Sequence, residues 1–406
     1  RKDLPRERIE YLPEETTCSC CHEELRRIGE EVTEELDYIP SQLIVREHVK
    51  VKLACPRCKD GVQTGKLPPE VQPIERGRAG VGLIVYIMLS KYCDHLPLFR
   101  LEKMFAREGI EIARQRMWDW LAAIADQLKS LHRALLAEML LVYYLQADET
   151  TIKVQLGEEK GKLHTGYFWA VHAPPNLVYY RYAPTRAGEV PLKLFDGYEG
   201  VIQTDLYAGY NAVFLPETCK RLACFAHVRR KFIEKGGASG KESNDIIKEI
   251  AKLYRVEKEA KGIGFEDRAE LRKRKSLPLL EALFSKIENL NQRLLPQHPL
   301  KEATEYALKQ KQELLRYVDD GRFEIDNNAI ERQMRPIAVG RKNYLFAGSP
   351  AGAEAAAIFY SLINSCKLNN INPREYLCDI LRRLPTHPAS RISELLPHRW
   401  TPLSAK

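Results

Sequence analysis

Residues 322–349 read RFEIDNNAIERQMRPIAVGRKNYLFAGS. Asp326 is a good helix N-cap, so this pattern predicts a helix that begins there and carries Glu331 in its opening turns. Pro336 disfavours helical geometry at Arg335, and we expect the regular helix to end or kink there. At helical spacing Glu331 and Arg335 share one polar face. Either that face is an ordinary solvated surface with a Glu331–Arg335 ion pair, or it binds phosphate and a cation.

A basic stretch follows this predicted helix. Gly340, Arg341, Lys342 and Asn343 are predicted to form a loop beside the glutamate helix. A polar helix face followed by a basic loop is a plausible place to contact phosphate.

Two other stretches each place an aspartate after a short apolar run. Residues 141–154, LVYYLQADETTIKV, predict a buried strand that ends in Asp148, and residues 200–210, GVIQTDLYAGY, predict another that ends in Asp205. Together with Glu331 they can form a cluster of three carboxylates, which repels itself unless cations neutralise it. Hard oxygen ligands favour Mg²⁺ or Mn²⁺. Two such ions, about 3.5–4 Å apart, can activate a water or hydroxyl and stabilise the leaving oxygen in phosphodiester chemistry.

Four blocks of this sequence resemble the signature blocks of the insertion-sequence-66 (IS66) family of bacterial transposases. They are QADETTIKV, IQTDLYAGYNAV, CFAHVRRKF and DNNAIERQMRPIAVGRKNYLFAGS. The resemblance runs through nearly the whole chain, and the last block is the most specific. It implies an Asp-Asp-Glu active site on a ribonuclease-H-like fold, with the catalytic, Mg²⁺-binding residues at Asp148, Asp205 and Glu331.

The resemblance also implies an organisation of the chain. We expect an α/β protein with a ribonuclease-H-like, retroviral-integrase-like core that holds a helical insertion, preceded by a small zinc-binding module and a helix-turn-helix-like region. The expected segments are a zinc module at 1–70, a helical DNA-binding linker at 71–138, the first part of the core at 139–235, a helical insertion at 236–320, the glutamate helix and basic loop at 321–348, and C-terminal helices with an extended tail at 349–406.

Composition sets broad limits. With 406 residues, of which 44% are hydrophobic, the chain can bury a large core and should hold more than one domain. No apolar run of about 18 residues predicts a membrane span, and no secretory signal is visible, so we expect a cytoplasmic, nucleoid-associated protein. The chain begins at Arg1 without methionine, and the family resemblance implies a coiled-coil-like segment ahead of the cysteines.

Ten cysteines in a cytosolic chain favour metal binding or burial over disulfides. Two Cys-x-x-Cys pairs stand out, and tetrahedral thiolate coordination by their four cysteines fits structural Zn²⁺. These residues are Cys18, Cys21, Cys55 and Cys58. Cys20 and His22 lie beside the first pair and are alternative ligands, and a redox dithiol is the other interpretation of the pairs.

Net charge is +8, which suits a polyanionic partner. Residues 221–275 hold 16 Lys and Arg against 9 Asp and Glu, which is either a solvated helical surface or a face that follows phosphates. Arg229, Arg230 and Lys231 in this segment, and Arg335, Arg341 and Lys342 near the glutamate, are predicted phosphate contacts. The Cys224-x-x-His227 motif offers two ligands, which are too few for a metal site unless other residues contribute. We favour the interpretation that Cys224 is a buried thiol and that His227 lies at the start of a helix near DNA.

Two apolar-patterned runs, residues 96–109 and 114–128, predict a helix, a turn and a second helix. Arg114, Gln115 and Arg116 at the start of the second helix are candidates to contact a major groove. The alternative is a plain helical bundle that connects the zinc module to the core.

The family resemblance therefore predicts a transposase that cleaves transposon ends and transfers the 3′ hydroxyl into target DNA. Its partners would be double-stranded DNA, namely terminal inverted repeats and target, a second copy of the chain, and accessory proteins of the same element. A zinc-bearing DNA-binding protein without catalysis and a structure-specific nuclease on the same fold are the alternatives.

Overall fold

The computed structural model describes residues 8, 20, 43–54, 62–68, 71, 73–74, 77–157, 161–236 and 240–402. The chain divides into two compact units, Arg1–Gly65 and Lys66–Lys406. In the first unit, β1 (Lys52–Leu53) pairs with β2 (Gln63–Thr64) in an antiparallel arrangement.

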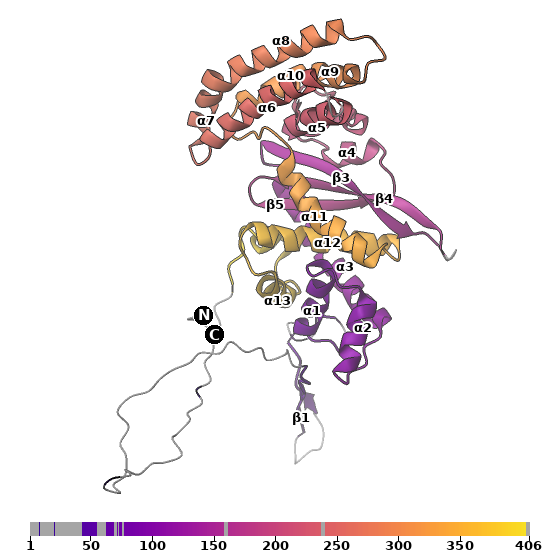
Figure 1. The fold of residues 1–406 in the computed structure, drawn as a ribbon. Helices are drawn as coiled ribbons and strands as arrows, with labels where there is room; N and C mark the ends of the chain where they lie inside the picture. Colours follow the sequence, from indigo (N-terminus) through magenta and orange to yellow (C-terminus); the bar gives the residue numbers. More distant parts are fainter. Residues whose placement is uncertain are drawn as a thin grey trace. The chain divides into compact units, whose positions relative to one another are not determined.

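A mixed five-stranded sheet lies at the centre of the second unit, and its strand order is β5-β4-β3-β6-β7. β3, β4 and β5 are antiparallel neighbours (Figure 1), whereas β6 and β7 run parallel to β3. The strands are β3 (Tyr144–Gln155), β4 (Leu163–Ala173), β5 (Leu177–Ala183), β6 (Gly200–Gln203) and β7 (Cys219–Leu222). The protein is therefore α/β, as the sequence predicts.

Buried strands of this sheet read as nearly continuous apolar runs, because helices cover them. All four residues of β6 are buried, and so is the second half of β4, which ends FWAVHA. The helices α3 (Arg114–Met139), α11 (Asn328–Tyr344) and α12 (Pro350–Leu368) pack on the β3-β4-β5 part of the sheet. On the chain between β5 and β7, α4 (Glu189–Leu194) contacts the 3-10 helix Ala208–Phe214.

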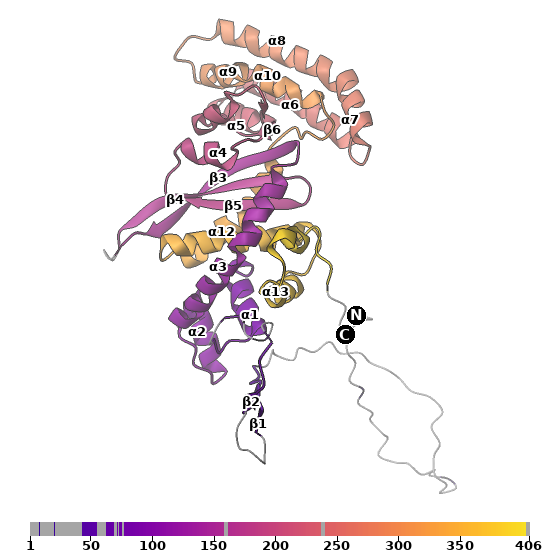
Figure 2. The same ribbon diagram turned by 180° about the vertical axis from the view of Figure 1, so that it is seen from behind.

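The predicted helical linker region contains α1 (Val81–Tyr92) and α2 (Leu98–Arg107), and α2 with the start of α3 corresponds to the predicted helices at 96–109 and 114–128. Gly109, with a φ of +77°, forms the turn that leads to α3. α3 is longer than predicted, because its apolar stripe continues from Leu128 to Met139. Figure 2 shows α3 continuing from this region to the sheet beside β5. There His132 lies 3.1 Å from the carbonyl oxygen of Tyr180 and 3.0 Å from the Ser361 hydroxyl, which ties the region to the core.

The predicted insertion is helical, and its buried core is continuous with the sheet through Tyr144, Val201 and Leu222. Its helices group together beyond α4 and α5 (Figure 1). They follow α5 (Phe225–Gly236) and are α6 (Lys241–Glu259), α7 (Phe265–Leu271), a π-helical turn (Arg272–Ser276), α8 (Leu277–Arg293), α9 (Pro299–Lys309), α10 (Lys311–Leu315) and a 3-10 turn (Arg316–Val318). Phe232, Ile250, Phe284 and Ala303 belong to the buried cluster that joins these helices to α5.

Helix α11 contradicts two predictions. It does not end at Arg335 but continues through Pro336 to Tyr344, so the predicted basic loop is its last turn. The proline removes one backbone hydrogen bond. Contacts with the sheet hold the helix on both sides of it: the Tyr180 hydroxyl donates to the carbonyl of Gln333 across 2.5 Å, and Arg341 binds β3.

The predicted extended tail is also wrong. After α13 (Pro373–Arg383), a 3-10 helix spans Ala389–Leu395, and Leu395 is fully buried. The Tyr376 hydroxyl donates to the carbonyl of Leu395 across 2.7 Å, and the Trp400 indole donates to Asp379 across 2.6 Å. These buried contacts fold the proline-rich segment back onto α13.

Candidate active site

Two aspartates follow matching positions of neighbouring parallel strands. Gln146 of β3 is in register with Gln203 of β6, and the Gln146 Nε2 donates to the Gln203 Oε1 across 2.9 Å. Asp148 and Asp205 each come two residues later. The prediction that Asp148 ends its strand is wrong: β3 continues to Gln155 as one arm of a hairpin with β4, since β-branched residues follow the aspartate. Asp148 therefore lies where β6 has ended and the β3 edge is open.

The start of α11 is fastened to β3 beside Asp148. The side chain of Asn327, at the N-cap position, donates to the carbonyl of Ala147 across 3.1 Å. The predicted N-cap, Asp326, lies one residue before the observed N-cap, because the helix begins at Asn328. The Asp326 Oδ1 still accepts the backbone N–H of Asn328 across 3.0 Å. Glu331, in the first turn, is thereby brought to the same end of the sheet.

The buried glutamine pair strengthens this attachment. Gln146 Nε2 also donates to the carbonyl of Asp326, across 3.2 Å, and Gln203 Nε2 donates to the carbonyl of Glu324, across 2.9 Å. Both glutamines are fully buried. Strands β3 and β6 thus hold the segment that enters α11, although some 120 to 180 residues separate these positions in sequence.

Electrostatic coupling links the three predicted carboxylates. The pKa of Asp148 is raised well above its ordinary value, first by burial and then by the charge of Glu149, with further contributions from Asp205 and Glu331. The backbone N–H of Glu149, which donates to the Asp148 Oδ1 across 2.8 Å, opposes the rise. Aspartates and glutamate that are far apart in sequence therefore share one electrostatic environment.

Glu331 faces the basic side of α5. Its Oε1 lies 3.6 Å from a guanidinium nitrogen of Arg230 and 3.8 Å from the His227 Nε2. Among the described residues these are its ion-pair partners, rather than Arg335, which is exposed. The same Oε1 is buried and has no hydrogen-bond partner. Within the described residues, no group of three or more His, Cys, Asp or Glu side chains is arranged to hold a metal ion.

Sequence reasoning missed the buried carboxylate of Glu149, next to Asp148. Glu149 accepts a hydrogen bond from the Nε of Arg186 across 2.7 Å and another from the Tyr210 hydroxyl across 2.9 Å. The Arg186 guanidinium stacks 3.6 Å from the Tyr207 ring centroid, and the Tyr207 backbone N–H donates to the Asp205 Oδ1 across 2.9 Å. These partners occupy Glu149 and hold the loop that carries Asp205. Tyr207 and Tyr210, which follow Asp205 in the sequence, were the signal from which these contacts could have been predicted.

The Cys224-x-x-His227 motif divides into a packed thiol and a site residue. The Cys224 Sγ is buried, accepts the backbone N–H of Asn327 across 3.2 Å, and has its pKa raised to about 12, chiefly by burial. This confirms the predicted buried thiol. The pKa of His227 is lowered, first by burial and then by Arg230, while Asp205 and Glu331 oppose the shift. His227 therefore lies among the predicted catalytic residues.

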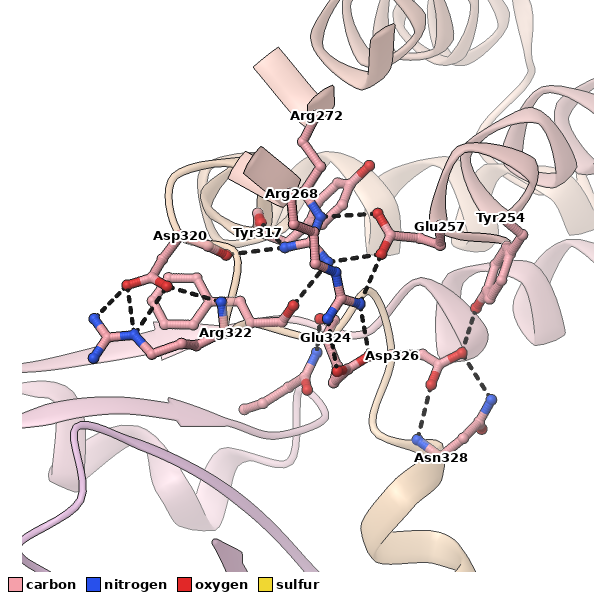
Figure 3. A network of polar contacts seen from close by, with 12 residues as sticks. Tyr254, Glu257, Arg268, Arg272, Tyr317, Asp320, Arg322, Glu324, Asp326 and Asn328 are labelled. Carbon is pink, nitrogen blue, oxygen red and sulfur yellow. Dashed lines mark hydrogen bonds and ion pairs between the residues drawn. The ribbon is translucent and has the colours of Figure 1, made fainter. Parts of the chain in front are cut away.

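The helical insertion holds the segment before α11 through a network of polar contacts (Figure 3). Arg272 is fully buried and uses all five of its N–H groups. Two donate to Glu257 across 2.9 and 2.7 Å, and the others donate to the carbonyls of Tyr317, Asp320 and Phe323. Every N–H group of the buried Arg272 guanidinium therefore has an acceptor, and these hydrogen bonds hold the turn that precedes α11.

The predicted phosphate contacts differ in how free they are. Arg229, Arg335 and Lys342 are exposed, and Arg230 is exposed but lies beside Glu331. Lys231 instead pairs with Glu302 at 3.1 Å, and Arg341 donates to the carbonyl of Thr151 across 2.7 Å and to the Thr150 hydroxyl across 3.0 Å. The last two side chains therefore have structural partners already.

Much of the positive charge of residues 221–275 is also paired. Ion pairs join Lys252 to Glu249, Lys275 to Glu259, and Arg268 to both Glu257 and Glu324. The solvated, internally paired surface is therefore the better description of most of this segment.

Arg114 and Arg116 project from the exposed start of α3. The backbone N–H of Arg114 donates to Glu102 across 3.0 Å, and Gln115 donates to Asp119 across 2.9 Å. Both arginine side chains are free to meet a partner. The proposed zinc ligands Cys18, Cys21, Cys55 and Cys58 lie outside the described residues, whereas Cys20 is described and exposed.

Comparison with known proteins identifies the family. The model described as "Transposase IS66 family" matches residues 76–355, which include Asp148, Asp205 and Glu331. The chain belongs to the IS66 family of transposases. The model of the IS66 C-terminal element matches residues 361–398, and that of the zinc-finger binding domain of IS66 transposases matches residues 15–59. The zinc-finger match spans all four cysteines of the two pairs in this IS66-family transposase.

Two similar proteins align with nearly all of this chain. Two proteins of Sinorhizobium fredii, named "Uncharacterized protein y4hP" and "Uncharacterized protein y4qI", are 33% and 34% identical to this chain. The alignments cover 99% and 98% of this IS66-family chain and 76% of each relative. In the described part of the chain, no helix combines the length and apolar character needed to cross a membrane.

Proposed function

We propose that this chain cleaves DNA at the ends of a mobile element and joins the freed 3′ hydroxyl to target DNA. The observation that carries the proposal is the register of Gln146 with Gln203, which gives Asp148 and Asp205 matching positions on neighbouring strands, while Asn327 fastens the glutamate helix beside Asp148. The raised pKa of Asp148, to which the charges of Asp205 and Glu331 contribute, agrees with this arrangement. A fold gains no stability from gathering like charges at one end of a sheet, so such a cluster favours a functional site.

The donor set fits divalent cations. Asp148, Asp205 and Glu331 offer hard carboxylate oxygens suited to Mg²⁺ or Mn²⁺, and the buried Oε1 of Glu331 lacks a hydrogen-bond donor. When bound, the ions would activate the attacking oxygen and stabilise charge on the leaving oxygen. The chain's own contribution is to keep these carboxylates together: Gln146 and Gln203 hold α11 against the strands, and Tyr207 holds Asp205.

We also propose that the core is ribonuclease-H-like. Three antiparallel strands, a short helix and two further parallel strands, in the order β5-β4-β3-β6-β7, support this assignment. The helical insertion between β7 and α11 accounts for the long separation of Asp205 from Glu331.

Phosphate binding is assigned to the exposed cations nearest the carboxylates. Arg230, beside Glu331, and Arg335, one turn further along α11, are the candidates to neutralise phosphate charge, with Arg229 and Lys342 beside them. Arg114 and Arg116 would contact DNA from the start of α3. Two copies of the chain, each acting on one transposon end, and accessory proteins of the same element remain part of the proposal.

A test with pre-cut ends separates this proposal from its rivals. The full chain is incubated with Mg²⁺, labelled duplexes that carry the terminal repeats of its own element, intact or pre-cut, and a target plasmid. We expect cleavage of the intact ends and joining of the pre-cut ends. Asp148→Asn, Asp205→Asn and Glu331→Gln should abolish both reactions and leave DNA binding largely intact.

Asp196→Asn is the matched control, because this aspartate is exposed and lies in the turn before β6. It should keep both reactions. Cleavage without joining would favour a structure-specific nuclease, and binding without either reaction would favour a non-catalytic DNA-binding protein.

A further inference from the structure

A cavity separate from the carboxylate cluster lies between the helical linker region and the sheet. Its volume is about 360 Å³, within the range of small-molecule sites. It is bounded by α1, α3, the β3-β4 hairpin, the end of α11 and the start of α12. Its lining includes Lys91, Trp118, Tyr344, Phe346 and Ser349.

Lys91 is the unusual member of this lining. Its ammonium group lies 4.9 Å from the Tyr344 ring centroid and 5.5 Å from the Tyr92 ring centroid, and it makes no hydrogen bond or ion pair with the described residues. Burial lowers its pKa to about 8. The two rings compensate only part of the cost of burying a charge. Lys91 is half-buried in the cavity wall and has no acidic partner among the described residues, which favours an anionic ligand.

The start of α12 adds a second feature that favours an anion. Ser349 is its N-cap and accepts the backbone N–H of Gly352 across 3.0 Å. Ser349 and Gly352 both line the cavity, so the positive end of this 19-residue helix is directed at the same cavity as Lys91.

Aromatic rings supply the rest of the surface. Trp118 is half-buried and Phe346 is 37% exposed, so both keep ring surface available. The residue between Tyr344 and Phe346, Leu345, has a φ of +64°, a backbone conformation that costs a branched residue about 1 kcal/mol or more. The chain therefore accepts strain at the turn that presents Phe346.

We propose that this cavity takes one nucleotide unstacked from a DNA strand, with its base against Trp118 and Phe346 and its phosphate toward Lys91. Aromatic faces stack on any base, and an ammonium beside a helix N-terminus suits phosphate. This inference rests on the proposed function, since it takes DNA to be the substrate.

The position along the chain fits a nucleotide near the reacting phosphate. Ile152, in the cavity wall, is four residues beyond Asp148 on β3, which is about 13 Å. Tyr344 is 13 residues beyond Glu331 on α11, which is about 20 Å. At about 3.4 Å per step of duplex, the nucleotide would lie roughly four to six positions from the cleavage point.

The test compares two overhangs with equal charge. A labelled hairpin duplex carries a single-stranded 3′ overhang of thymidines or of abasic residues, and binding to the full chain is measured by fluorescence anisotropy without Mg²⁺. The wild-type chain should bind the thymidine overhang at least roughly five-fold more tightly, the lower range for stacking one base. Trp118→Leu and Phe346→Ala should remove this preference, whereas Lys91→Met should lower the affinity for both overhangs by the same factor.

Phe265→Ala on α7 and Lys193→Met on α4 are the matched controls, since both side chains are exposed and lie outside the cavity. They should bind as the wild type does. Equal binding of the two overhangs by the wild-type chain would overturn the inference, as would a preference that survives Phe346→Ala. If only the pocket is wrong, Mg²⁺-dependent cleavage and joining persist without the base preference. If the proposed function is wrong, those two reactions fail in the wild-type chain.

Discussion

The hydroxyl of Tyr254 donates a hydrogen bond to the Oδ2 of Asp326 across 2.8 Å (Figure 3). Tyr254 belongs to α6 of the insertion, and Asp326 caps the helix that carries Glu331. The insertion is thus connected directly to the start of the glutamate helix. We infer that the insertion helps to position the helix that carries Glu331.

Tyr254→Phe should slow end cleavage several-fold with little change in DNA affinity. The substitution removes one hydrogen bond, worth about 1 kcal/mol, and leaves the ring in place. Single-turnover cleavage rates and binding by anisotropy are the two measurements. Tyr86→Phe, which alters a partly exposed ring on α1, should match the wild type in both. An unchanged cleavage rate in Tyr254→Phe would argue against a positioning role.

Asp148→Asn should stabilise the metal-free chain at neutral pH by on the order of 1 kcal/mol, because it removes a disfavoured charge. The pKa of Asp148 in the folded state is raised above 3.8. Its contribution to stability is therefore complete below pH 3.8 and is lost as pH rises through the folded-state pKa. Urea unfolding in EDTA at several pH values measures the effect, with Asp196→Asn as control. A loss of stability in Asp148→Asn at neutral pH would contradict the electrostatic interpretation.

Lys91→Met should also stabilise the chain at pH 7, by on the order of 2 kcal/mol. The pKa of Lys91 falls from 10.5 to about 8 on folding, so the charged form, present below pH 8, is the one that burial penalises. Wild-type stability should therefore gain a contribution as pH rises from about 8 to 10.5, and the variant should lack it. Thermal melts across this range test the claim, and equal melting temperatures at pH 7 would refute it.

Zinc binding should depend on Cys21 but not on Cys20. We expect one Zn²⁺ per chain by atomic absorption, retained in Cys20→Ser and lost in Cys21→Ser, because the four paired cysteines would complete a tetrahedral site. Chelation should unfold the predicted zinc module, since we expect the metal to supply much of its folding free energy. Loss of zinc from Cys20→Ser would move the ligand assignment to the neighbouring cysteine.

Local pattern was sufficient for the strands and for the order of the elements. The apolar runs before Asp148 and Asp205, and the Pro-Pro-Asn turn between β4 and β5, are short-range signals, and the structure has strands and a turn there. The extent of β3 was predicted too short, although β-branched residues follow Asp148, because the pairing with β4 that extends the strand was not foreseen. Likewise, the sheet contacts that carry α11 through Pro336 come from Tyr180 and Thr151, distant in sequence.

Side-chain partners were the least predictable part of the candidate site. Nothing near Glu149 in the sequence indicates Arg186 or Tyr210, and nothing near Arg341 indicates Thr150. A basic residue in a motif can equally contact DNA or bridge two elements of the fold. Only the folded chain separates Lys231, paired with Glu302, from the exposed Arg229.

Mn²⁺ binding tests most directly whether Asp148, Asp205 and Glu331 form one metal site. Calorimetric titration of the full chain with Mn²⁺ should show binding that Asp148→Asn, Asp205→Asn and Glu331→Gln each weaken roughly tenfold or more, because each removes a ligand. Asp196→Asn should bind as the wild type does. Wild-type Mn²⁺ affinity in any one of the three variants would remove that residue from the site and contradict the account.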